Sequence, residues 1–393
     1  MATPSELLDL SDPEVLRDPY PHLAALRAHD PFVWHEGLQA HVASGHAQVS
    51  AALRDRRLGR VYRDREPAQD WATFNWLHAD SILDSEPPKH TRLRRLVAGA
   101  FGRGHVARLE PRIRAIAEEL VDAAGPGPFD LVEAVAEPLP VTVIAELLDW
   151  PRADRHLLRP WSQAIVAMYE VDPGEQARAE ALRASSDFAA YVDELAAHRA
   201  RHPGEDLLTD LVQARDAGDA LSRHELVATV VLLLNAGHEA SVNGLSNGIH
   251  SWITAGSPAV DVEDDAALAL LVEELLRHDS PLHLFERTAT ADLEIDGRPV
   301  AEGERVHVLL GAANRDPAVF AEPDRFDPRR DPNPHLAFGL GIHFCIGAPL
   351  ARLELQQSVR ALLRRHPRLE VVEAVRRPTF VLRGFERLVL ADA

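Results

Sequence analysis

The chain has 393 residues, 61 acidic and 42 basic, and its formal charge of −19 argues against nucleic acid or an anionic membrane as the main partner. Its longest uncharged apolar run, Leu226 to Leu234, is shorter than the roughly 18 residues of a membrane span, and residues 1–13 lack the pattern of a signal peptide. Because Cys345 is the only cysteine, disulfides and multi-cysteine metal sites within the chain are excluded. We therefore expect a soluble cytoplasmic protein.

Short strands are predicted near the start of the chain, at residues 32–34 and 40–42. Helical periodicity dominates from about residue 90 to 280, with a long apolar helix at about 222–253. Strands are predicted again at residues 293–295, 305–310, 379–382 and 386–390, and Asp296-Gly297 is typical of a turn between two strands. No linker or repeat interrupts the sequence, so we predict a single domain, 1–393, mainly α-helical with small peripheral β-sheets.

The segment 335–352 reads HLAFGLGIHFCIGAPLAR and surrounds the cysteine with glycines. Glycine permits positive φ angles and close approach of the backbone to a bound group. A helical pattern begins just beyond Cys345, and the positive end of a helix favours a thiolate over a thiol. A lone cysteine is more often a buried small hydrophobe, but the glycines and the helix favour a ligand here. No companion His and Asn or Asp supports the other alternative, a cysteine nucleophile.

The pattern Phe338-Gly339-x-Gly341-x-His343-x-Cys345-x-Gly347, followed by Leu350-Ala351-Arg352, resembles the haem-binding signature of the cytochrome P450 family. The resemblance covers almost the whole chain, from Asp18 to the Arg383-Gly384 turn. It implies the cytochrome P450 fold, with haem b as the cofactor and Cys345 as the axial thiolate of the iron. Such a thiolate pushes electron density toward the iron and favours O–O cleavage. Backbone N–H groups of the loop are expected to bond the sulfur.

Four basic residues are implied as ligands of the two haem propionates. His90 and Arg94 lie four residues apart on one face of a predicted helix, and Arg287 and His343 complete the set. Taken singly, each of them is more often a solvated surface charge.

Glu274 and Arg277 resemble the E-x-x-R motif of the family. Arg325 stands where the family carries the arginine that completes a buried triad with them. We interpret these three residues as structural support for the haem loop, and an exposed ion pair is the ordinary alternative.

The central helix departs from the family pattern. The resemblance implies that Gly237 opens the helix for dioxygen and that Glu239 connects the site to solvent protons. The threonine that normally follows is replaced by Ala240, and Ser241 comes next. Three possibilities stay open. Ser241 supplies the hydroxyl, a group of the substrate supplies it, or proton delivery is poorer and much hydrogen peroxide is released. Since one helical step turns a side chain by about 100°, we expect substrate or ordered water rather than Ser241 to fill this place.

By analogy with the family, the substrate pocket is mostly apolar and aromatic, which is typical of a site for a hydrophobic organic molecule. For each lining residue, ordinary core packing is the alternative. The candidates are Phe74, Trp76, Met168, Val231, Asn235, Ala236, Leu284, Phe285 and Leu382.

The sequence holds no flavin, nicotinamide or iron–sulfur module, so we expect ferredoxin and ferredoxin reductase to supply electrons. A basic patch for the ferredoxin is one interpretation of Arg92, Arg95, Arg103 and Arg352, and scattered surface arginines are the other.

The predicted function is a haem-thiolate monooxygenase that uses O₂ and two electrons to hydroxylate or epoxidise a hydrophobic small molecule, such as a secondary metabolite. Two alternatives stay open. One is oxidative coupling or ring formation without oxygen insertion, and the other is a haem sensor or carrier.

Overall fold

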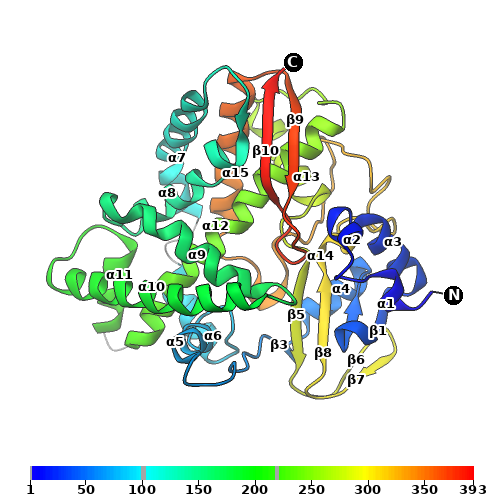
Figure 1. Cartoon of the computed structure of the whole chain (residues 1–393), viewed down its shortest axis with the longest axis horizontal. Helices are drawn as coiled ribbons and strands as arrows, with labels where there is room; N and C mark the ends of the chain where they lie inside the picture. The colour runs from blue at the N-terminus through cyan, green and yellow to red at the C-terminus, as the bar shows by residue number, and fades with distance from the viewer. Residues whose placement is uncertain (1, 99–102, 217–220) are drawn as a thin grey trace. The chain divides into compact units, whose positions relative to one another are not determined.

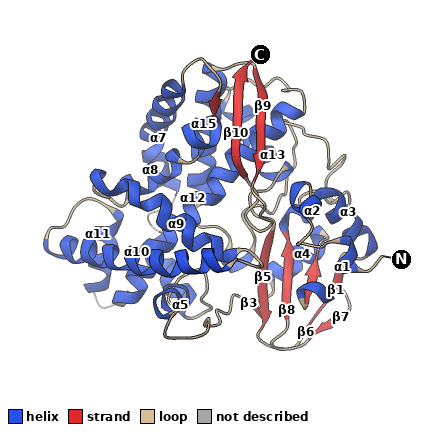
Figure 2. Ribbon diagram, viewed as in Figure 1, coloured by secondary structure: helices blue, strands red, loops and turns tan. Residues whose placement is uncertain are grey.

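The computed structural model describes residues 2–98, 103–216 and 221–393, and the chain forms two compact units. Unit 1 contains residues 1–59, 117–136 and 240–393, and unit 2 contains residues 60–116 and 137–239. Two helices, α7 (Arg103–Ala124) and α12 (Arg223–Thr254), begin in unit 2 and end in unit 1. The course of the chain can be followed by colour in Figure 1. Most elements are helical and the sheets are small, as the sequence predicted (Figure 2).

A five-stranded sheet forms one part of unit 1. Its strand order is β1 (Phe32–His35), β2 (Ala40–Ala43), β8 (Arg305–Leu309), β5 (Leu284–Ala289) and β3 (Leu58–Gly59). Only β2 and β8 pair in parallel, and the other neighbours pair antiparallel. Apolar side chains of the sheet pack on α4 (His46–Arg54) in one buried cluster and on residues of the N-terminal helices in another. These helices are α1 (Pro4–Leu7), α2 (Pro13–Arg17) and α3 (Tyr20–His29).

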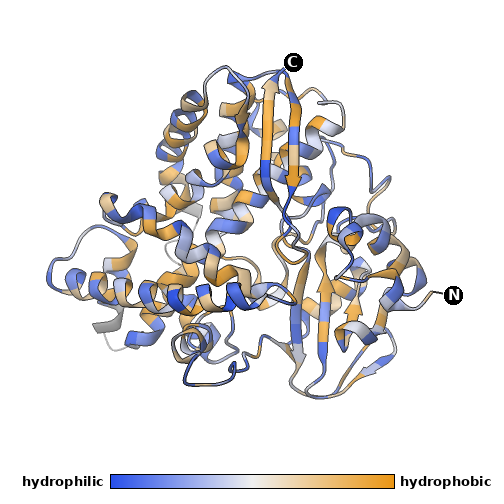
Figure 3. Cartoon of the chain, viewed as in Figure 1, coloured by the Kyte–Doolittle hydropathy of each residue, from blue (hydrophilic) through white to orange (hydrophobic). Residues whose placement is uncertain are grey.

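Unit 1 has two further sheets. The hairpin of β6 (Leu293–Ile295) and β7 (Arg298–Val300) turns at Asp296 and Gly297, whose φ angles of 53° and 74° confirm the predicted turn. The other sheet has the order β4 (Phe129–Asp130), β10 (Phe385–Asp392) and β9 (Leu369–Arg376). Figure 3 shows apolar residues along β10 and alternating apolar and polar residues along β9.

The predicted strand at residues 379–382 is wrong. Leu382 makes only an isolated bridge with Leu282, whereas the sequence reading missed β5 and β9. Strand β9 pairs with β10 through its backbone while half of its side chains are exposed to solvent, and Val372 is 56% exposed. Its sequence, LEVVEAVR, contains three valines, a residue type enriched in strands, so a strand signal was present there and was missed.

The remaining helices of unit 1 are α13 (Asp265–His278), α14 (Leu310–Ala313) and α15 (Ala348–Arg365), with the short helices η1 (Glu36–Leu38), η3 (Val132–Ala136) and η6 (Gly341–His343). The elements that lie within unit 2 are α5 (Ala72–Ala79), α6 (Lys89–Ala98), α8 (Pro138–Leu147), η4 (Arg152–Leu157), α9 (Leu158–Val166), η5 (Ala167–Tyr169), α10 (Glu175–Arg201) and α11 (Leu207–Asp216).

Aromatic stacking joins α9 to α10 in unit 2. The ring of Trp161 stacks on that of Phe188 with 5.1 Å between centroids, and Trp150 stacks on Tyr191 at 4.8 Å. Aromatic pairs of this kind add to the stabilisation that burial of their apolar area provides.

The central helix α12 begins and ends within one residue of the range expected from the sequence. Among the described residues it is the one helix long and apolar enough to cross a membrane, but 72% of its most apolar 18-residue window is buried inside the protein. The apolar side chains of α12 therefore belong to the core.

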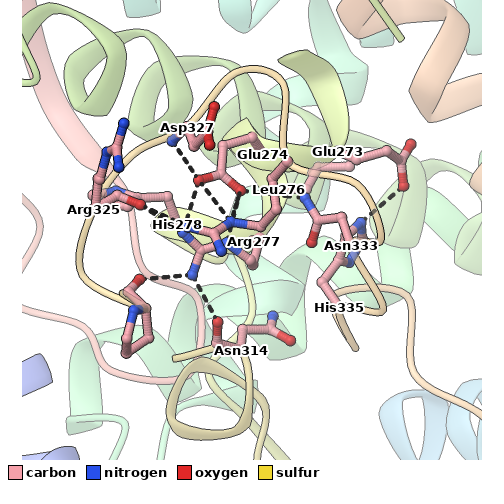
Figure 4. Close-up of polar contacts among 12 residues, drawn as sticks. Glu273, Glu274, Leu276, Arg277, His278, Asn314, Arg325, Asp327, Asn333 and His335 are labelled. Carbon is pink, nitrogen blue, oxygen red and sulfur yellow. Dashed lines mark hydrogen bonds and ion pairs between the residues drawn. The ribbon is translucent and has the colours of Figure 1, made fainter. Parts of the chain in front are cut away.

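A buried ion pair in unit 1 fixes the segment that leads to the cysteine loop (Figure 4). Neither Glu274 nor Arg277 is exposed to solvent. The Arg277 Nε donates to Glu274 Oε2 at 2.7 Å and Nη2 donates to Oε1 at 2.8 Å. The guanidinium also donates to the backbone carbonyls of Asn314, Pro323 and Arg325. One arginine thus connects α13 to the irregular chain between α14 and η6.

The third member of the buried group is Arg330 and not Arg325, which corrects the sequence prediction. Arg330 Nε donates to Glu274 Oε2 at 3.2 Å, whereas the side chain of Arg325 pairs with Glu322 at the surface. Arg325 takes part only through its backbone carbonyl. The sequence motif located the correct segment, but the direction of each side chain was decided by the path of an irregular loop.

We expect Arg330→Ala to lower the melting temperature of the holoprotein clearly and Arg325→Ala to leave it nearly unchanged. A hydrogen bond to a buried charged group contributes about 1.5–3 kcal/mol, and an exposed ion pair contributes about 0–1 kcal/mol. Thermal unfolding followed by circular dichroism measures the difference. Equal losses in the two variants, or a larger loss for Arg325→Ala, would show that the assignment of Arg330 is wrong.

Candidate functional site

Cys345 lies in unit 1 between η6 and the start of α15, and its side chain is half-buried. The N–H of Cys345 donates to the carbonyl of Phe338 at 3.0 Å, and the N–H of Phe344 donates to Gly341 at 3.1 Å. These bonds close the loop. The backbone N–H of Cys345 is bonded to Phe338 and not to the cysteine's own sulfur. The first helical residue of α15 is Ala348, so the sulfur lies near the positive end of this helix, where the thiolate form is favoured.

Two of the loop glycines are required by their backbone conformation. Gly339 and Gly341 have φ angles of 68° and 73°, and a Cβ atom on Gly341 would lie 2.3 Å from the carbonyl oxygen of Leu53. A Cβ atom on Gly347 would lie 3.9 Å from the Cys345 sulfur. The loop therefore packs closely on the end of α4 and leaves the surroundings of the sulfur free of side-chain bulk from Gly347.

Arg352 holds the loop from the first turns of α15. Its guanidinium carbon lies 4.4 Å from the centre of the Phe338 ring, and its Nε donates to Glu273 Oε1 at 2.6 Å. Glu273 also bonds the Nε2 of His335 at 2.9 Å. Burial alone would raise the pKa of Glu273, but the hydrogen bonds from Arg352 and His335 outweigh it and lower the pKa to about 2. Arg352 is thus engaged within the protein rather than being a free surface charge.

The four predicted propionate ligands are divided between the units. Arg287 of unit 1 is 3% exposed on β5, where it donates to the carbonyl of Glu286 and lies over the Phe285 ring. His343 is half-buried at the end of η6. In unit 2, His90 is buried on α6 and Arg94 follows one turn later.

The chemistry of these residues fits the haem that the resemblance implies. One sulfur ligand stands in a glycine-lined loop, and the basic side chains are donors of the kind that propionate carboxylates require. As the resemblance implies, the residues that would hold the group are Cys345 at the iron and His90, Arg94, Arg287 and His343 at the propionates.

One face of α12 is accessible in the middle of an otherwise buried helix. Ala236 is exposed and Gly237, Ala240 and Ser241 are half-buried, and their spacing places all four on the same side. A Cβ atom on Gly237 would contact Ile144 of α8 at 3.4 Å. Glu239 is buried, with its Oε1 3.9 Å from Nδ1 of His238.

Sequence reasoning missed Glu354 as a functional candidate. The hydroxyl of Ser241 on α12 donates to Glu354 Oε2 on α15 at 3.2 Å. Burial raises the pKa of Glu354 to about 8, although the hydrogen bond from Ser241 lowers it in part, so the carboxyl carries a proton at pH 7. The available signal was an acidic residue on the apolar face of α15, four residues after Leu350.

In unit 2, the structure brings two of the predicted pocket residues, Val231 and Asn235, to one small cavity. Three others lie near it in the chain but not in its wall. Phe74 stacks on His78, Trp76 stacks on His224, and Met168 is buried with its carbonyl bonded to Arg65. His78 and Tyr169 line the cavity and were not among the predicted pocket residues.

The pocket candidates of unit 1 lie in two segments that touch. Leu284 is buried and Phe285 is half-buried at the start of β5, and Leu382 pairs with Leu282 just before this strand. The remaining candidate, Ala236, belongs to unit 2 and lies on the accessible face of α12.

Comparison with known proteins agrees with this arrangement. A family model described as Cytochrome P450 matches residues 265–385, which include α13 and the cysteine loop. The chain is 39% identical to the cytochrome P450 monooxygenase PikC of Streptomyces venezuelae, over 94% of this chain and 90% of that protein. It is 37% identical to 6-deoxyerythronolide B hydroxylase of Saccharopolyspora erythraea, over 90% of each chain.

A solved structure shows the same fold. P450BioI, in complex with an acyl carrier protein ligated to hexadec-9Z-enoic acid, superposes with a TM-score of 0.91 at 33% identity, over 96% of this chain and 99% of that one. The mainly helical fold with small sheets is therefore the cytochrome P450 fold. The chain belongs to the cytochrome P450 family, and its cofactor is haem b.

Proposed function

We propose that this P450 monooxygenase hydroxylates or epoxidises a hydrophobic small molecule of secondary metabolism, in the cytoplasm, with electrons from ferredoxin and ferredoxin reductase. The observation that carries the proposal is the position of the only cysteine, half-buried in a glycine loop at the start of α15. The accessible stretch of α12 beside the buried acid Glu239 supports an oxygen-activating enzyme over a sensor or carrier.

When bound through Cys345, haem supplies the reductive activation of O₂, with the balance R–H + O₂ + 2 H⁺ + 2 e⁻ → R–OH + H₂O. The chain's own residues have three tasks. Arg287 and His343, with His90 and Arg94, bind the propionates by charge-assisted hydrogen bonds. The apolar side chains of the pocket orient the substrate and exclude water. Buried acids deliver the two protons.

Glu354 and Ser241 are the proposed proton donors to the oxygen site. Glu354 is 3% exposed and retains its proton at neutral pH, and Ser241 lies at hydrogen-bond distance from it on the accessible face of α12. A hydroxyl can accept a proton on one side and donate one on the other. In this proposal Ser241 passes on the proton, because Ala240 has no hydroxyl to do so. The Ser241 side chain leaves the helix in a different direction from that of residue 240.

The redox partner is inferred from chemistry and relatives. The sequence shows no redox module besides the haem signature, and its relatives include bacterial cytochrome P450 enzymes. Of the four arginines considered for a basic patch, Arg92 pairs with Glu225 and Arg352 pairs with Glu273. Arg95 is exposed on α6, and the side chain of Arg103 lies outside the described residues.

The substrate class is supported by the names of the relatives. They include 6-deoxyerythronolide B hydroxylase and nocardicin C N-oxygenase, the second being 37% identical over 92% of this chain. One solved neighbour is named for C–S bond formation. Whether an oxygen atom from O₂ enters the product therefore has to be measured.

Reduced holoprotein with carbon monoxide should show the strongly red-shifted Soret band of thiolate-ligated haem. Cys345→His should abolish this band while haem still binds, because an imidazole replaces the thiolate at the iron. Absorption spectroscopy of the freshly purified protein measures both. An unshifted band in folded wild type would exclude thiolate ligation.

Turnover under ¹⁸O₂ should place one labelled oxygen atom in the product and the other in water. Mass spectrometry of the product decides between this reaction and its alternative. A product without label, formed with consumption of O₂ and electrons, would identify oxidative coupling or ring formation instead.

We expect the yield of product per NAD(P)H to fall as the pH rises through about 8, because Glu354 then loses the proton it donates. Ser241→Ala and Glu354→Gln should lower the yield about tenfold or more at pH 7 and release peroxide instead.

The free energy of unfolding of the wild type should also fall between pH 4.5 and 8, since unfolded Glu354 ionises near 4.5 while the folded carboxyl stays protonated. Glu354→Gln should remove this slope.

Ser358→Ala is the matched control, because the Ser358 hydroxyl donates to the backbone carbonyl of Glu354 and not to its carboxyl group. This variant should retain the yield and the pH profile of wild type. If Ser241→Ala kept full yield and Ala240→Thr raised it, the relay would run through substrate or water. If the product yield still fell near pH 8 in Glu354→Gln but no longer fell in Glu239→Gln, Glu239 would be the proton donor instead.

A further inference from the structure

Two buried polar groups line the small cavity in unit 2, and within the part of the chain that the structure describes their outward atoms have no hydrogen-bond partner. The atoms are Nε2 of His78 on α5 and Oδ1 of Asn235 on α12. The two residues are 7% and 4% exposed. The rest of the cavity wall is largely apolar, with Leu77, Ile165 and Leu232 among its residues. A buried acceptor without a donor costs free energy, so a donor from outside the chain would be bound there.

The protonation of His78 is decided by its surroundings. Its Nδ1 lies 2.9 Å from the carbonyl oxygen of Phe74, and because a carbonyl only accepts, this nitrogen carries the hydrogen. Burial lowers the pKa of His78, so the ring is neutral and Nε2 is a bare acceptor. Stacking on Phe74 at 4.1 Å and on Tyr62 at 5.3 Å fixes the plane of the ring. The acceptor is therefore held in one direction.

Asn235 places the second acceptor close to the reactive part of α12. It lies one residue before the accessible stretch that begins at Ala236, and four residues before Glu239. At a rise of about 1.5 Å per residue, the amide is within two helical turns of Ala240. A group bound by Asn235 is thus positioned along the same helix that presents the oxygen site.

Two further polar residues of the wall, Ser81 and Asp84, are already engaged. The Ser81 hydroxyl accepts from the N–H of Asp84 at 3.2 Å, and the Asp84 carboxylate pairs with Arg60 at 3.0 Å. Because the Asp84 charge is compensated, no carboxylate in this wall is available for a cationic ligand. The cavity measures about 10 Å³, room for about one water molecule or one hydroxyl group.

We propose that His78 and Asn235 form a specificity-determining subsite that accepts a hydrogen bond from a hydroxyl group of the substrate. The natural substrate is then a hydrophobic alcohol rather than a hydrocarbon or an ether. This inference rests on the proposed function, in which the pocket takes a hydrophobic small molecule.

Matched ring alcohols and ethers test the subsite in the holoenzyme. The probes are cyclohexanol, cyclooctanol and cyclododecanol, each compared with its methyl ether, which retains the oxygen but cannot donate. Dissociation constants come from calorimetry and from the change in haem spin state. At least one alcohol should bind wild type about fivefold more tightly than its ether. The ratio should fall to about one in His78→Phe and in Asn235→Leu, and His78→Gln, which retains an acceptor, should preserve part of it.

Leu232→Ile is the control, because it changes an apolar part of the same wall and should leave the ratio of alcohol to ether unchanged. The absence of any alcohol preference in wild type, or its survival in both His78→Phe and Asn235→Leu, overturns the inference. If the ethers bind as well as the alcohols, the apolar pocket of the proposed function stands and only the subsite fails. If neither class binds while the carbon monoxide band is intact, the apolar pocket itself is wrong, and the subsite with it.

Discussion

The buried ion pair of Glu274 and Arg277 is the interaction on which the position of the cysteine loop depends. Neither side chain is exposed, so each charge has to be matched inside the protein. Arg277 meets this requirement with the carboxylate and with backbone carbonyls of residues 314–325. Residues 314–340 are all described and contain no helix or strand, so these contacts take over the role that regular hydrogen bonding has elsewhere. The loop that carries Cys345 follows directly.

The same physics gives three buried or half-buried carboxyl groups different roles. Glu274 faces two arginines and Glu273 faces Arg352 and His335, so both serve as anchors for the loop. Among the described residues, the carboxyl of Glu354 has a hydrogen bond only from the Ser241 hydroxyl, and burial raises its pKa to about 8. A carboxylate with cations next to it stays ionised and holds structure, whereas an isolated buried carboxyl keeps a proton that it can give away. The number of cationic side chains next to each carboxyl group therefore distinguishes the carboxyl groups that hold the loop from the one that delivers a proton.

Polar groups in the substrate region follow a related rule. Among the described residues, Nε2 of His78 and Oδ1 of Asn235 have no hydrogen-bond partner, while Ser81 and Asp84 nearby are bonded within the protein. Only the unmet acceptors can distinguish one ligand from another, because a group that is already bonded gains little from a new partner. Apolar contacts then set the size of the substrate, and the two acceptors set its polar group.

The sequence by itself determined the features that depend on local spacing. These include the cysteine loop, the bounds of α12 and the turn at Asp296-Gly297, because glycine positions and helical periodicity act over a few residues. Only the tertiary structure decided that Arg330 rather than Arg325 bonds Glu274, that Ser241 bonds a carboxyl 113 positions further along the chain, and that β9 forms with exposed side chains. These contacts join distant segments, and their geometry is set by how the helices pack and where an irregular loop runs. A sequence pattern names the chemical groups, but burial and distance, which decide their charge and their partners, exist only in the folded chain.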